Sequence, residues 1–456
     1  MSILFNLIYL SVMAIFSPWL MWRMIVQNKN RRGWSAKFLG YAPRRTSDAK
    51  CLWFHAVSVG EVNLLKPIIE RIRQEHPYFE IAVSSTTETG RQLAADVFSE
   101  DITFFCPADF SWAIKRTLRR LRPDQLILAE LELWPNLIRI TSARSIPVSV
   151  INGRLSARSA RGYRKLGFLF RPIFQQIDWI GAQSSDYAQR FVDNGCAADK
   201  VTITGSVKFD GVKTDRNNAA TLELKAVAAA HGIAAEDFVF VGGSTQLEED
   251  LLLADAYVRL RQTHPQLRLI LVPRHPVRVP QLCREFENRK IPFALRSSEQ
   301  ATSEDASEDA SEAISVEGAV LIVDVIGELS AWWGVADAGF VGGSMGTRGG
   351  QSMIEPAGFG VPVCFGPNTE NFKSTVSPLI ENDAAEVVNN GHQIETFIKW
   401  SIEMSHLAQA MGLRAQKVVA QNTGAADRTV AGILALSQGG EAESPPQSRP
   451  SVVSAA

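Results

Sequence analysis

The stretch CLWFHAVSVGEV, residues 51–62, joins an apolar run to a turn that carries a glycine and a carboxylate. The run at residues 51–57 is typical of a buried strand, and a helical pattern follows it. Glu61 therefore lies where a strand is expected to become a helix. An acid in the first helical turn is common because it interacts favourably with the helix dipole. From this stretch alone, a helix cap and a catalytic carboxylate both stay open.

The same alternation of apolar runs and amphipathic stretches continues along the chain. It predicts βαβ units and an α/β fold whose parallel sheets are covered by helices on both faces. The runs of the first half are CLWFHAV, EIAVSST, ITFFCP, QLILAEL, IPVSVING, WIGAQS and VTITGS, and those of the second half are DFVFVGGST, LRLILVPRHP, AVLIVDV, ADAGFVGGS and PVCFG. Two such series, joined near residues 205–218, predict two Rossmann-like domains with the site in the cleft between them.

Composition narrows the classes of function. The 456 residues exceed one ordinary domain, and a formal net charge of -1 gives no overall signal for nucleic-acid binding. Five dispersed cysteines without a C-x-x-C pair argue against a disulfide framework or a zinc ribbon. The seven histidines show no metal-ligand spacing, so we expect neither a metal nor another cofactor.

The N-terminus predicts a membrane anchor over residues 1–28. The first 22 residues carry no charge, and a helix of that length matches a hydrocarbon core of roughly 30 Å. Seven basic residues and one acid follow between Lys29 and Lys50, which places the body of the protein on the cytoplasmic side of the membrane. Pro18 interrupts the run, so a helix lying on the membrane and a helix buried in the domain stay open.

The remaining boundaries follow from composition. We expect an N-terminal domain over residues 29–212 and a C-terminal domain over residues 213–436. The acidic, serine-rich stretch at residues 297–318 is typical of a solvated insertion, and residues 437–456 are typical of a disordered tail.

Polar residues directly after the apolar runs are the candidates for chemistry, because open α/β sheets bind ligands beyond the carboxyl ends of their strands. In AELELWPN, residues 129–136, Glu130 and Glu132 are two residues apart. In an extended chain both would point to the same face. Such a pair either shares a basic partner or controls its own protonation.

A stretch that contains basic residues but no acidic ones follows Glu130 and Glu132. Residues 133–177 contain eight bases and no acid, and Arg154, Arg158, Arg161 and Lys165 are spaced as one helical stripe. Lipid phosphates are the partner that such a stripe favours beside a membrane anchor. Nucleic acid is disfavoured, because the aromatic residues here form no evident stacking platform.

The second half carries features suited to a nucleotide. Gly242, Gly243, Ser244 and Thr245 end a run before an acid-rich helix, where backbone N–H groups can bind phosphate. Arg274 can hold a phosphate through two hydrogen bonds, and the adjacent His275 has an orienting role. Glu355, near the start of a helix beyond the glycine-rich segment, can accept ribose hydroxyls. Neither G-x-G-x-x-G nor a P-loop is present, which disfavours NAD, kinases and ATPases.

Ordered blocks over most of the chain carry a resemblance to a known family. The blocks are HAVSVGEV, ELELWPNL, INGRLSARSARGYRKL, TGSVKFD, LVPRHPVR, IGELSAWWGVADAGFVGGS and RGGQSMIEPA. With them the chain resembles the bacterial 3-deoxy-D-manno-octulosonic acid (Kdo) transferases of lipopolysaccharide assembly. The resemblance implies a metal-independent GT-B glycosyltransferase that moves Kdo from CMP-Kdo to the lipid A precursor, lipid IVA, at the cytoplasmic face of the inner membrane.

The resemblance also implies roles for single residues. Glu61 matches the catalytic base, Glu130 and Glu132 match acids near the sugars, and Lys208 matches a position that can screen the donor carboxylate. The positions associated with CMP are Arg274, Gly327, Glu328, Gly343 and Glu355. With Ser244, Thr245, His275 and Ser352 they form the expected donor site, while Arg154, Arg158 and Arg161 form the expected acceptor site.

One block departs from the family pattern. Where the family shows GGHNPLEP or GGHNPLEA, this chain has GGQSMIEP, with Gln351 and Ser352 in place of His and Asn. Their different reach affects contacts to the nucleotide. A GT-B enzyme with another nucleotide sugar and a membrane lipid acceptor is the alternative, and a membrane-bound nucleotide sensor would have no use for Glu61.

Overall fold

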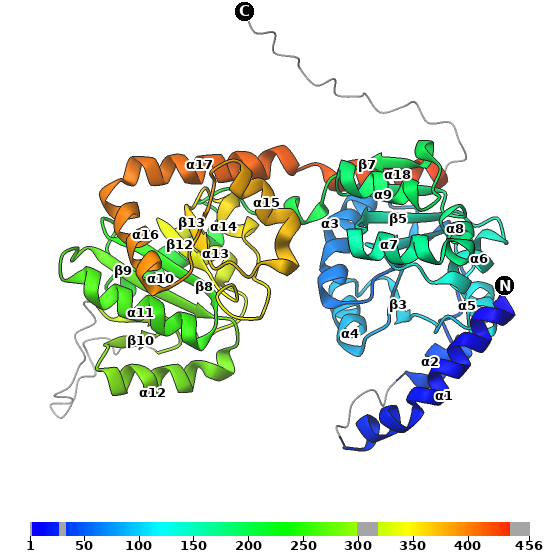
Figure 1. Ribbon diagram of the computed structural model, residues 1–456, viewed down its shortest axis with the longest axis horizontal. Helices are drawn as coiled ribbons and strands as arrows, with labels where there is room; N and C mark the ends of the chain where they lie inside the picture. Colours follow the sequence, from blue (N-terminus) through cyan, green and yellow to red (C-terminus); the bar gives the residue numbers. More distant parts are fainter. Residues whose placement is uncertain (1, 27–32, 299–317, 438–456) are drawn as a thin grey trace, which may run out of the picture. The chain divides into compact units, whose positions relative to one another are not determined.

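The chain forms two compact units in the computed structural model, which describes residues 2–26, 33–298 and 318–437 (Figure 1). The first unit comprises Met1–Asp210 and Thr423–Ala456, and the second comprises Gly211–Asn422. The insertion expected at residues 297–318 and the tail expected at 437–456 lie almost entirely outside the described residues.

The first unit is built on a parallel sheet of seven strands in the order β3-β2-β1-β4-β5-β6-β7. All seven apolar runs expected in the first half are strands. They are β1 (Cys51–His55), β2 (Glu80–Ser85), β3 (Ile102–Phe105), β4 (Gln125–Ala129), β5 (Val148–Gly153), β6 (Trp179–Ala182) and β7 (Val201–Ile203).

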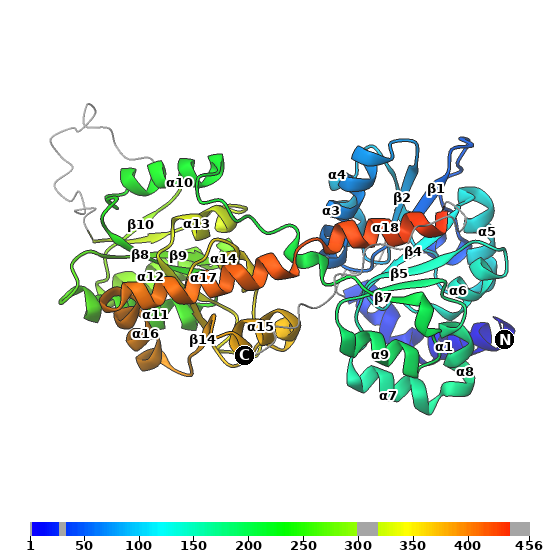
Figure 2. The same cartoon turned by 90° about the horizontal axis from the view of Figure 1, so that it is seen from above.

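Helices cover both faces of this sheet, as Figure 2 shows. They are α1 (Ser2–Val26), α2 (Trp34–Leu39), α3 (Val59–Glu75), α4 (Glu88–Val97), α5 (Ser111–Leu121), α6 (Pro135–Ser142), α7 (Ala157–Lys165), α8 (Gly167–Phe174), α9 (Ser185–Asp193) and α18 (Ala425–Ser437), with short 3-10 turns η1 (Ala198–Lys200) and η2 (Val207–Phe209).

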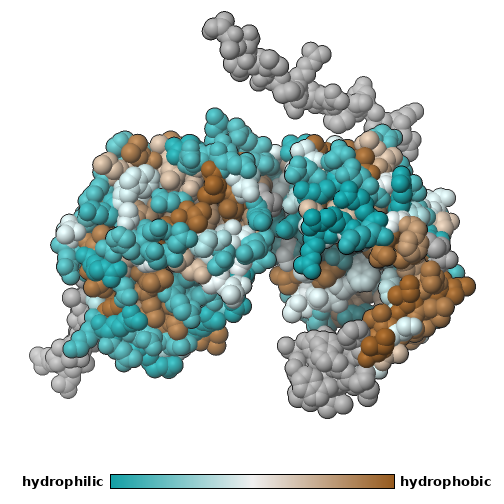
Figure 3. Space-filling model, viewed as in Figure 1, coloured by the Kyte–Doolittle hydropathy of each residue, from teal (hydrophilic) through white to brown (hydrophobic). Residues whose placement is uncertain are grey.

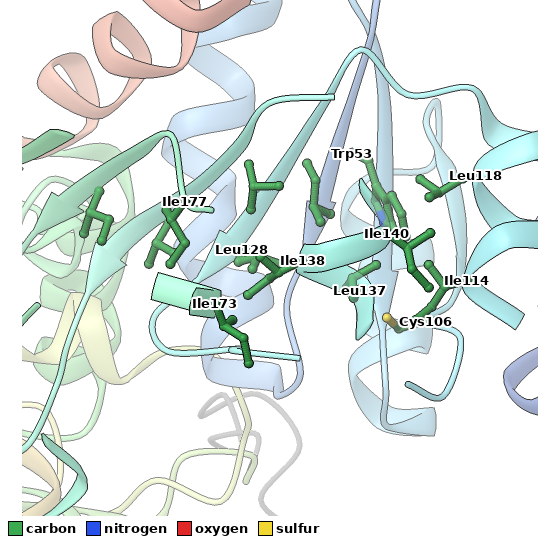
Figure 4. Packing of buried hydrophobic residues seen from close by; sticks show 14 of the residues in the cluster. Trp53, Cys106, Ile114, Leu118, Leu128, Leu137, Ile138, Ile140, Ile173 and Ile177 are labelled. Carbon is green, nitrogen blue, oxygen red and sulfur yellow. The ribbon is translucent and has the colours of Figure 1, made fainter. Parts of the chain in front are cut away.

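Alternation along β1 divides the core of the first unit in two. Trp53 belongs to the apolar cluster with residues of α5, α6 and α8 (Figure 4), whereas Leu52 and Phe54 belong to the cluster with residues of α3 and α18. Successive strand residues point to opposite faces, so a strand buried on both faces is apolar throughout. This explains the unbroken apolar run that precedes Glu61.

The second unit also contains a parallel sheet of seven strands, in the order β10-β11-β9-β8-β12-β13-β14. Its strands are β8 (Phe238–Thr245), β9 (Leu267–Pro273), β10 (Phe293–Leu295), β11 (Val320–Ile322), β12 (Ala338–Val341), β13 (Val363–Phe365) and β14 (Glu386–Val387). The five expected runs are strands. The sequence analysis missed β10 and β14, which are short edge strands without a long apolar run.

The helices of the second unit again lie on both faces of its sheet (Figures 1 and 2). They are α10 (Ala219–Ala230), α11 (Leu247–Arg261), α12 (Val279–Arg289), α13 (Leu329–Val335), α14 (Ile354–Gly358), α15 (Lys373–Glu381), α16 (Gly391–Glu403) and α17 (Ser405–Asn422), with 3-10 turns η3 (Pro276–Arg278) and η4 (Glu370–Phe372). The expectation of two parallel α/β sheets is confirmed.

The last helix, α18, belongs to the first unit, although the sequence analysis placed residues up to 436 in the C-terminal domain. It contacts α3 and buries Val430 and Ile433 in the core there. Asp210 accepts hydrogen bonds from the backbone N–H groups of Gly424 and Ala426, at the start of this helix. An amphipathic helix can pack on either sheet, so its sequence alone does not assign it to a unit.

The N-terminal helix α1 packs on the first unit near α5 and α6. Phe5 is buried, Asn6 donates to Ser111 Oγ at 2.8 Å, and Tyr9 donates to Asp109 Oδ2 at 2.7 Å. No helix in the described part of the chain is long and apolar enough to cross a membrane. The expected anchor over residues 1–28 therefore finds no support as a membrane-spanning helix.

Candidate functional site

Glu61 lies in the first turn of α3, directly after β1. Its carboxylate accepts the backbone N–H of Val57 at 2.7 Å and the hydroxyl of Ser58 at 3.0 Å, while Ser58 Oγ accepts the N–H of Glu61 at 3.4 Å. These bonds resemble a capping box. Glu61 is thus a helix cap in the structure, and the same bonds hold its carboxylate in a defined position at the carboxyl edge of the sheet.

Glu130 and Glu132 follow β4, the strand beside β1. The expectation that they point to one face of an extended strand is wrong, because β4 ends at Ala129 and Glu130 has a φ of 56°. A residue other than glycine rarely adopts this left-handed conformation, and such residues often lie at functional sites. The Glu132 carboxylate accepts the indole N–H of Trp134 at 2.9 Å.

Lys208 brings a positive charge to these carboxylates. It lies in η2, after β7, and its Nζ is 3.5 Å from Glu130 Oε1. Burial, followed by the charge of Glu130, raises the pKa of Glu61, whereas the Val57 and Ser58 hydrogen bonds and the charge of Lys208 lower it. Burial, followed by the charge of Glu61, raises the pKa of Glu132 to about 7. The structure therefore gathers Glu61, Glu130, Glu132 and Lys208 into one electrostatically coupled group, which we call the carboxylate cluster.

The basic residues expected to bind the acceptor are only partly on one stripe. Arg158 and Arg161 are exposed on α7, but Arg154 precedes this helix and belongs to the loop after β5. The four-residue step from Arg154 to Arg158 therefore does not describe a helical face. Among the described residues, none of these three arginines has an ion-pair partner within 4.0 Å.

Ser244 and Thr245 are the last residues of β8 and are almost fully buried. Gly242 and Gly243 lie inside the same strand, so the expectation of a phosphate-binding turn at these glycines is wrong. The glycine at 243 is needed for packing, because a Cβ atom there would lie 2.3 Å from the indole ring of Trp333. Ser244 has a φ of 55° where the strand ends.

A concentration of positive charge lies beyond β9. Arg274 and His275 are exposed there, and the pKa of His275 is lowered by desolvation and then by the charges of Arg278, Arg274 and Arg348. Arg348 comes from the glycine-rich segment after β12, and the sequence analysis missed it. Proximity between loops more than 70 residues apart in the chain leaves no local signal, although a basic residue in a glycine-rich loop was an available hint.

A small cavity of about 100 Å³ adjoins this charge. Ser244, Arg274 and Gly327 line it, together with the exposed Ile326. Larger cavities of about 390 and 300 Å³ in the second unit share Arg216 and Asp337 and lie away from the expected donor residues. Of these three cavities, only the small one is lined by expected donor residues.

Glu328 is already engaged within the protein. Arg296 donates to both of its carboxylate oxygens, at 3.2 and 3.1 Å, and the indole N–H of Trp332 donates at 3.2 Å. These bonds fix the loop that begins α13 beside Gly327. Glu328 therefore has structural partners, Arg296 and Trp332, which the sequence did not predict.

The glycine-rich segment is held by a buried carboxylate from α11. Glu249 accepts the N–H groups of Gly343 at 2.7 Å, Ser344 at 2.9 Å and Met345 at 2.9 Å, as well as that of Gln246 at 2.8 Å. Successive backbone N–H groups of this kind form an anion-binding nest. Because Glu249 fills the nest, the N–H of Gly343 is not free for a ligand. From the sequence, Glu249 was only one of the acids of an acid-rich helix.

Ser352 and Glu355 lie together at the other end of that segment. Burial raises the pKa of Glu355, while a hydrogen bond with the Ser352 side chain and the charge of Arg274 lower it. Of the expected donor residues, Ser244, Arg274 and Gly327 line the cavity. The charge of Arg274 also acts on the carboxyl group of Glu355, which is hydrogen-bonded to Ser352.

The raised pKa of Glu132 predicts a pH-dependent stability. A carboxyl group whose pKa is higher in the folded than in the unfolded protein stabilises the fold at pH values below its ordinary pKa of 4.5. This stabilisation is lost as the pH rises through the folded-state pKa of about 7. We expect Glu132→Gln to gain stability relative to wild type as pH increases from about 5 to 8. Urea midpoints of both proteins across this range measure the effect, with Glu75→Gln, at an exposed position of α3, as the control. A difference that does not change with pH would contradict the buried, coupled state of Glu132.

Comparison with known proteins finds relatives that match most of the chain. Residues 30–211 match the family model of 3-deoxy-D-manno-octulosonic-acid transferases (kdotransferases). The chain is 30% identical over 380 residues to a 3-deoxy-D-manno-octulosonic acid transferase of Haemophilus influenzae, covering 83% of this chain and 85% of the relative. It is 29% identical over 391 residues to one of Bordetella pertussis, covering 83% and 86%.

Solved structures show the same architecture. A glycosyltransferase from Rickettsia africae superposes with a TM-score of 0.56 at 12% identity, over 86% of this chain and 98% of that one. This likeness shows an α/β fold of the GT-B type with two parallel sheets. The identity to the Haemophilus influenzae relative, over 83% of this chain, establishes that the chain belongs to the 3-deoxy-D-manno-octulosonic acid transferase family.

Proposed function

We propose that the protein is an inverting, metal-independent glycosyltransferase that moves Kdo from CMP-Kdo to the lipid A precursor, lipid IVA, in lipopolysaccharide assembly. Membership of the family supports the reaction class. The observation that carries the assignment is the carboxylate cluster, in which Glu61 is held at the β1–α3 turn with a raised pKa.

Glu61 is the general base in this proposal. Its carboxylate takes the proton of an acceptor hydroxyl, and the resulting oxygen attacks the anomeric carbon of Kdo. The bond from that carbon to the CMP phosphate breaks, and its electron pair leaves with the phosphate. A raised pKa brings a carboxylate closer to the value that general-base catalysis at neutral pH requires. Two hydrogen bonds orient the carboxylate before the acceptor binds.

The donor is assigned to the second unit. CMP-Kdo carries a phosphate and a sugar carboxylate, both of which are anionic, and Arg274 and Arg348 supply exposed positive charge beside the small cavity. The carboxylate of Glu355, near Arg274, is suited to accept ribose hydroxyls. Since Glu249 fills the N–H nest of the glycine-rich segment, arginine side chains rather than that nest would neutralise the phosphate.

The acceptor is assigned to the first unit. Arg158 and Arg161 are exposed on α7 and form no ion pair with a carboxylate of the described residues, which suits the phosphates of a lipid A precursor. Phe168, at the start of α8, is 80% exposed and lies close in sequence to these arginines. A single exposed ring offers no series of stacking positions for successive bases, so the charge beside it favours a lipid headgroup over nucleic acid.

We assign the protein to the cytoplasmic face of the inner membrane through α1. While Phe5 and Tyr9 hold one side of this helix to the unit, seven large apolar side chains of the same helix are exposed and form part of the hydrophobic surface in Figure 3. They are Ile3, Leu4, Leu7, Ile8, Leu10, Val12 and Ile15. A docked helix with an exposed apolar side favours binding along the membrane surface.

Glu61→Gln tests the base. We expect Kdo transfer to lipid IVA to fall by about 10² to 10⁴ while CMP binding stays within about twofold, because the change removes only the proton acceptor. Mass spectrometry of the product and calorimetry of CMP binding measure the two effects. Wild-type kcat/KM should fall as pH drops through a value above the ordinary glutamate pKa of 4.5.

Glu70→Gln, on the exposed side of α3, is the matched control for that variant. Loss of CMP binding or of folding in Glu61→Gln would contradict the role of Glu61 as a base. No transfer of Kdo by a folded wild type that binds CMP would favour the alternative, a GT-B enzyme with another nucleotide sugar.

The double variant Arg158→Glu/Arg161→Glu tests the acceptor surface. We expect about a tenfold or greater increase in KM for a bisphosphorylated lipid acceptor, with little change in KM for the donor, because two attractive charges become repulsive. The control is Lys115→Glu/Arg119→Glu, which makes the same charge change at two exposed positions of α5 in the same unit. An equal loss with a dephosphorylated acceptor would argue against phosphate contact.

Ile3→Glu/Leu7→Glu tests the membrane surface. We expect this variant to float less with vesicles of phosphatidylethanolamine and phosphatidylglycerol than wild type, because charge replaces two exposed apolar side chains. Ser11→Glu/Ser17→Glu adds the same charge at exposed polar positions of the helix and should lose less binding. If both variants float alike, the apolar side of α1 is not the membrane contact.

A further inference from the structure

Asn152 is the penultimate residue of β5 and has a left-handed backbone conformation that few residues other than glycine adopt. It is fully buried, and its φ of 51° lies in the left-handed region that favours glycine. β5 is the neighbour of β4, and the N–H of Glu130 donates to the carbonyl of Ile151 at 2.9 Å. Asn152 thus lies at the sheet edge that carries the carboxylate cluster.

The two halves of the Asn152 amide differ in their partners. Oδ1 accepts the backbone N–H of Val207 at 3.1 Å, whereas Nδ2 is buried with no hydrogen-bond partner among the described residues. A buried unpaired donor is unfavourable. Glycine would adopt the same φ without strain and without an orphan donor. The fold alone therefore does not favour asparagine here, and the bond to Val207 is what the side chain provides.

That bond holds the turn that carries Lys208. Val207 is the first residue of η2 and is itself buried, and Lys208 follows it with Nζ 3.5 Å from Glu130 Oε1. A lysine side chain is long and flexible, so its reach depends on where its backbone is fixed. The hydrogen bond from Val207 fixes the backbone one residue before Lys208.

We propose that Asn152 is a positioning residue of the carboxylate cluster: its amide oxygen holds η2 so that the ammonium group of Lys208 stays beside Glu130 and within the field of Glu61. The catalytic consequence rests on the proposed function, whereas the placement of Lys208 does not. Because the charge of Lys208 lowers the pKa of Glu61, displacing it should raise that pKa.

A double-mutant cycle tests the proposal with Asn152→Gly, Lys208→Ala and the combined variant. Glycine keeps the backbone conformation and removes only the amide. We expect Asn152→Gly to lower kcat/KM for Kdo transfer by about tenfold, as for one lost hydrogen bond, and to change it by less than about twofold when Lys208 is already alanine. The acid limb of the pH profile should move to higher pH in both single variants.

Ser145→Gly is the matched control. Ser145 also has a left-handed φ, of 56°, but it precedes β5 at the opposite edge of the sheet, so the change relieves similar strain away from the cluster. Its kcat/KM should equal that of wild type. If Asn152→Gly does not fold, Val207→Pro removes the same bond from the donor side, since proline suits the first position of a helical turn and Ser206 has the extended conformation that proline requires.

Independent effects of Asn152→Gly and Lys208→Ala would overturn the proposal. A wild type without Kdo transfer would contradict the proposed function but not this inference, which can be measured without turnover. Carboxyl ¹³C NMR should then show the pKa of Glu61 raised by each single variant and not raised further by their combination. An unchanged Glu61 titration in Asn152→Gly would overturn the inference in either case.

Discussion

The balance between one ammonium group and three carboxylates organises the first unit. Glu61, Glu130 and Glu132 repel one another, and burial raises the pKa of Glu61 and of Glu132. Lys208 offsets part of that repulsion through its ion pair with Glu130. A base that must accept a proton near neutral pH needs such an intermediate environment, because strong pairing would lower its pKa and full isolation would keep it protonated.

Parallel topology is what brings these four residues together. Glu61 follows β1, Glu130 and Glu132 follow β4, and Lys208 follows β7, so their loops leave the sheet at the same edge. The central strands are mostly apolar because both of their faces are covered, and the charged side chains of the carboxylate cluster lie beyond the strand ends. The core and the cluster are therefore two consequences of one arrangement.

The second unit has the same parallel topology, but the side chains that gather beyond β9 are positively charged. Two different loops contribute three arginines, Arg274, Arg278 and Arg348. Their combined positive charge suits an anionic donor. The glycine-rich segment does not compete for that role, since Glu249 already satisfies three of its N–H groups. A filled nest keeps the segment in one conformation, so a donor bound at the proposed site would meet a surface that is ordered before binding.

The sequence by itself determined all seven strands of the first sheet, five of the seven strands of the second, and the position of Glu61 after the first strand. Apolar runs and their spacing are local signals, and buried parallel strands must carry them. Only the tertiary structure decided that α18 packs on the first unit, that Arg154 lies off α7, that Glu130 takes a left-handed conformation and that Glu249 fills the nest. Each of these depends on a contact or a backbone turn set by residues distant in the chain. Local patterns carry no information about such contacts, because the same side chain satisfies its hydrogen bonds and its charge with whatever the fold places beside it.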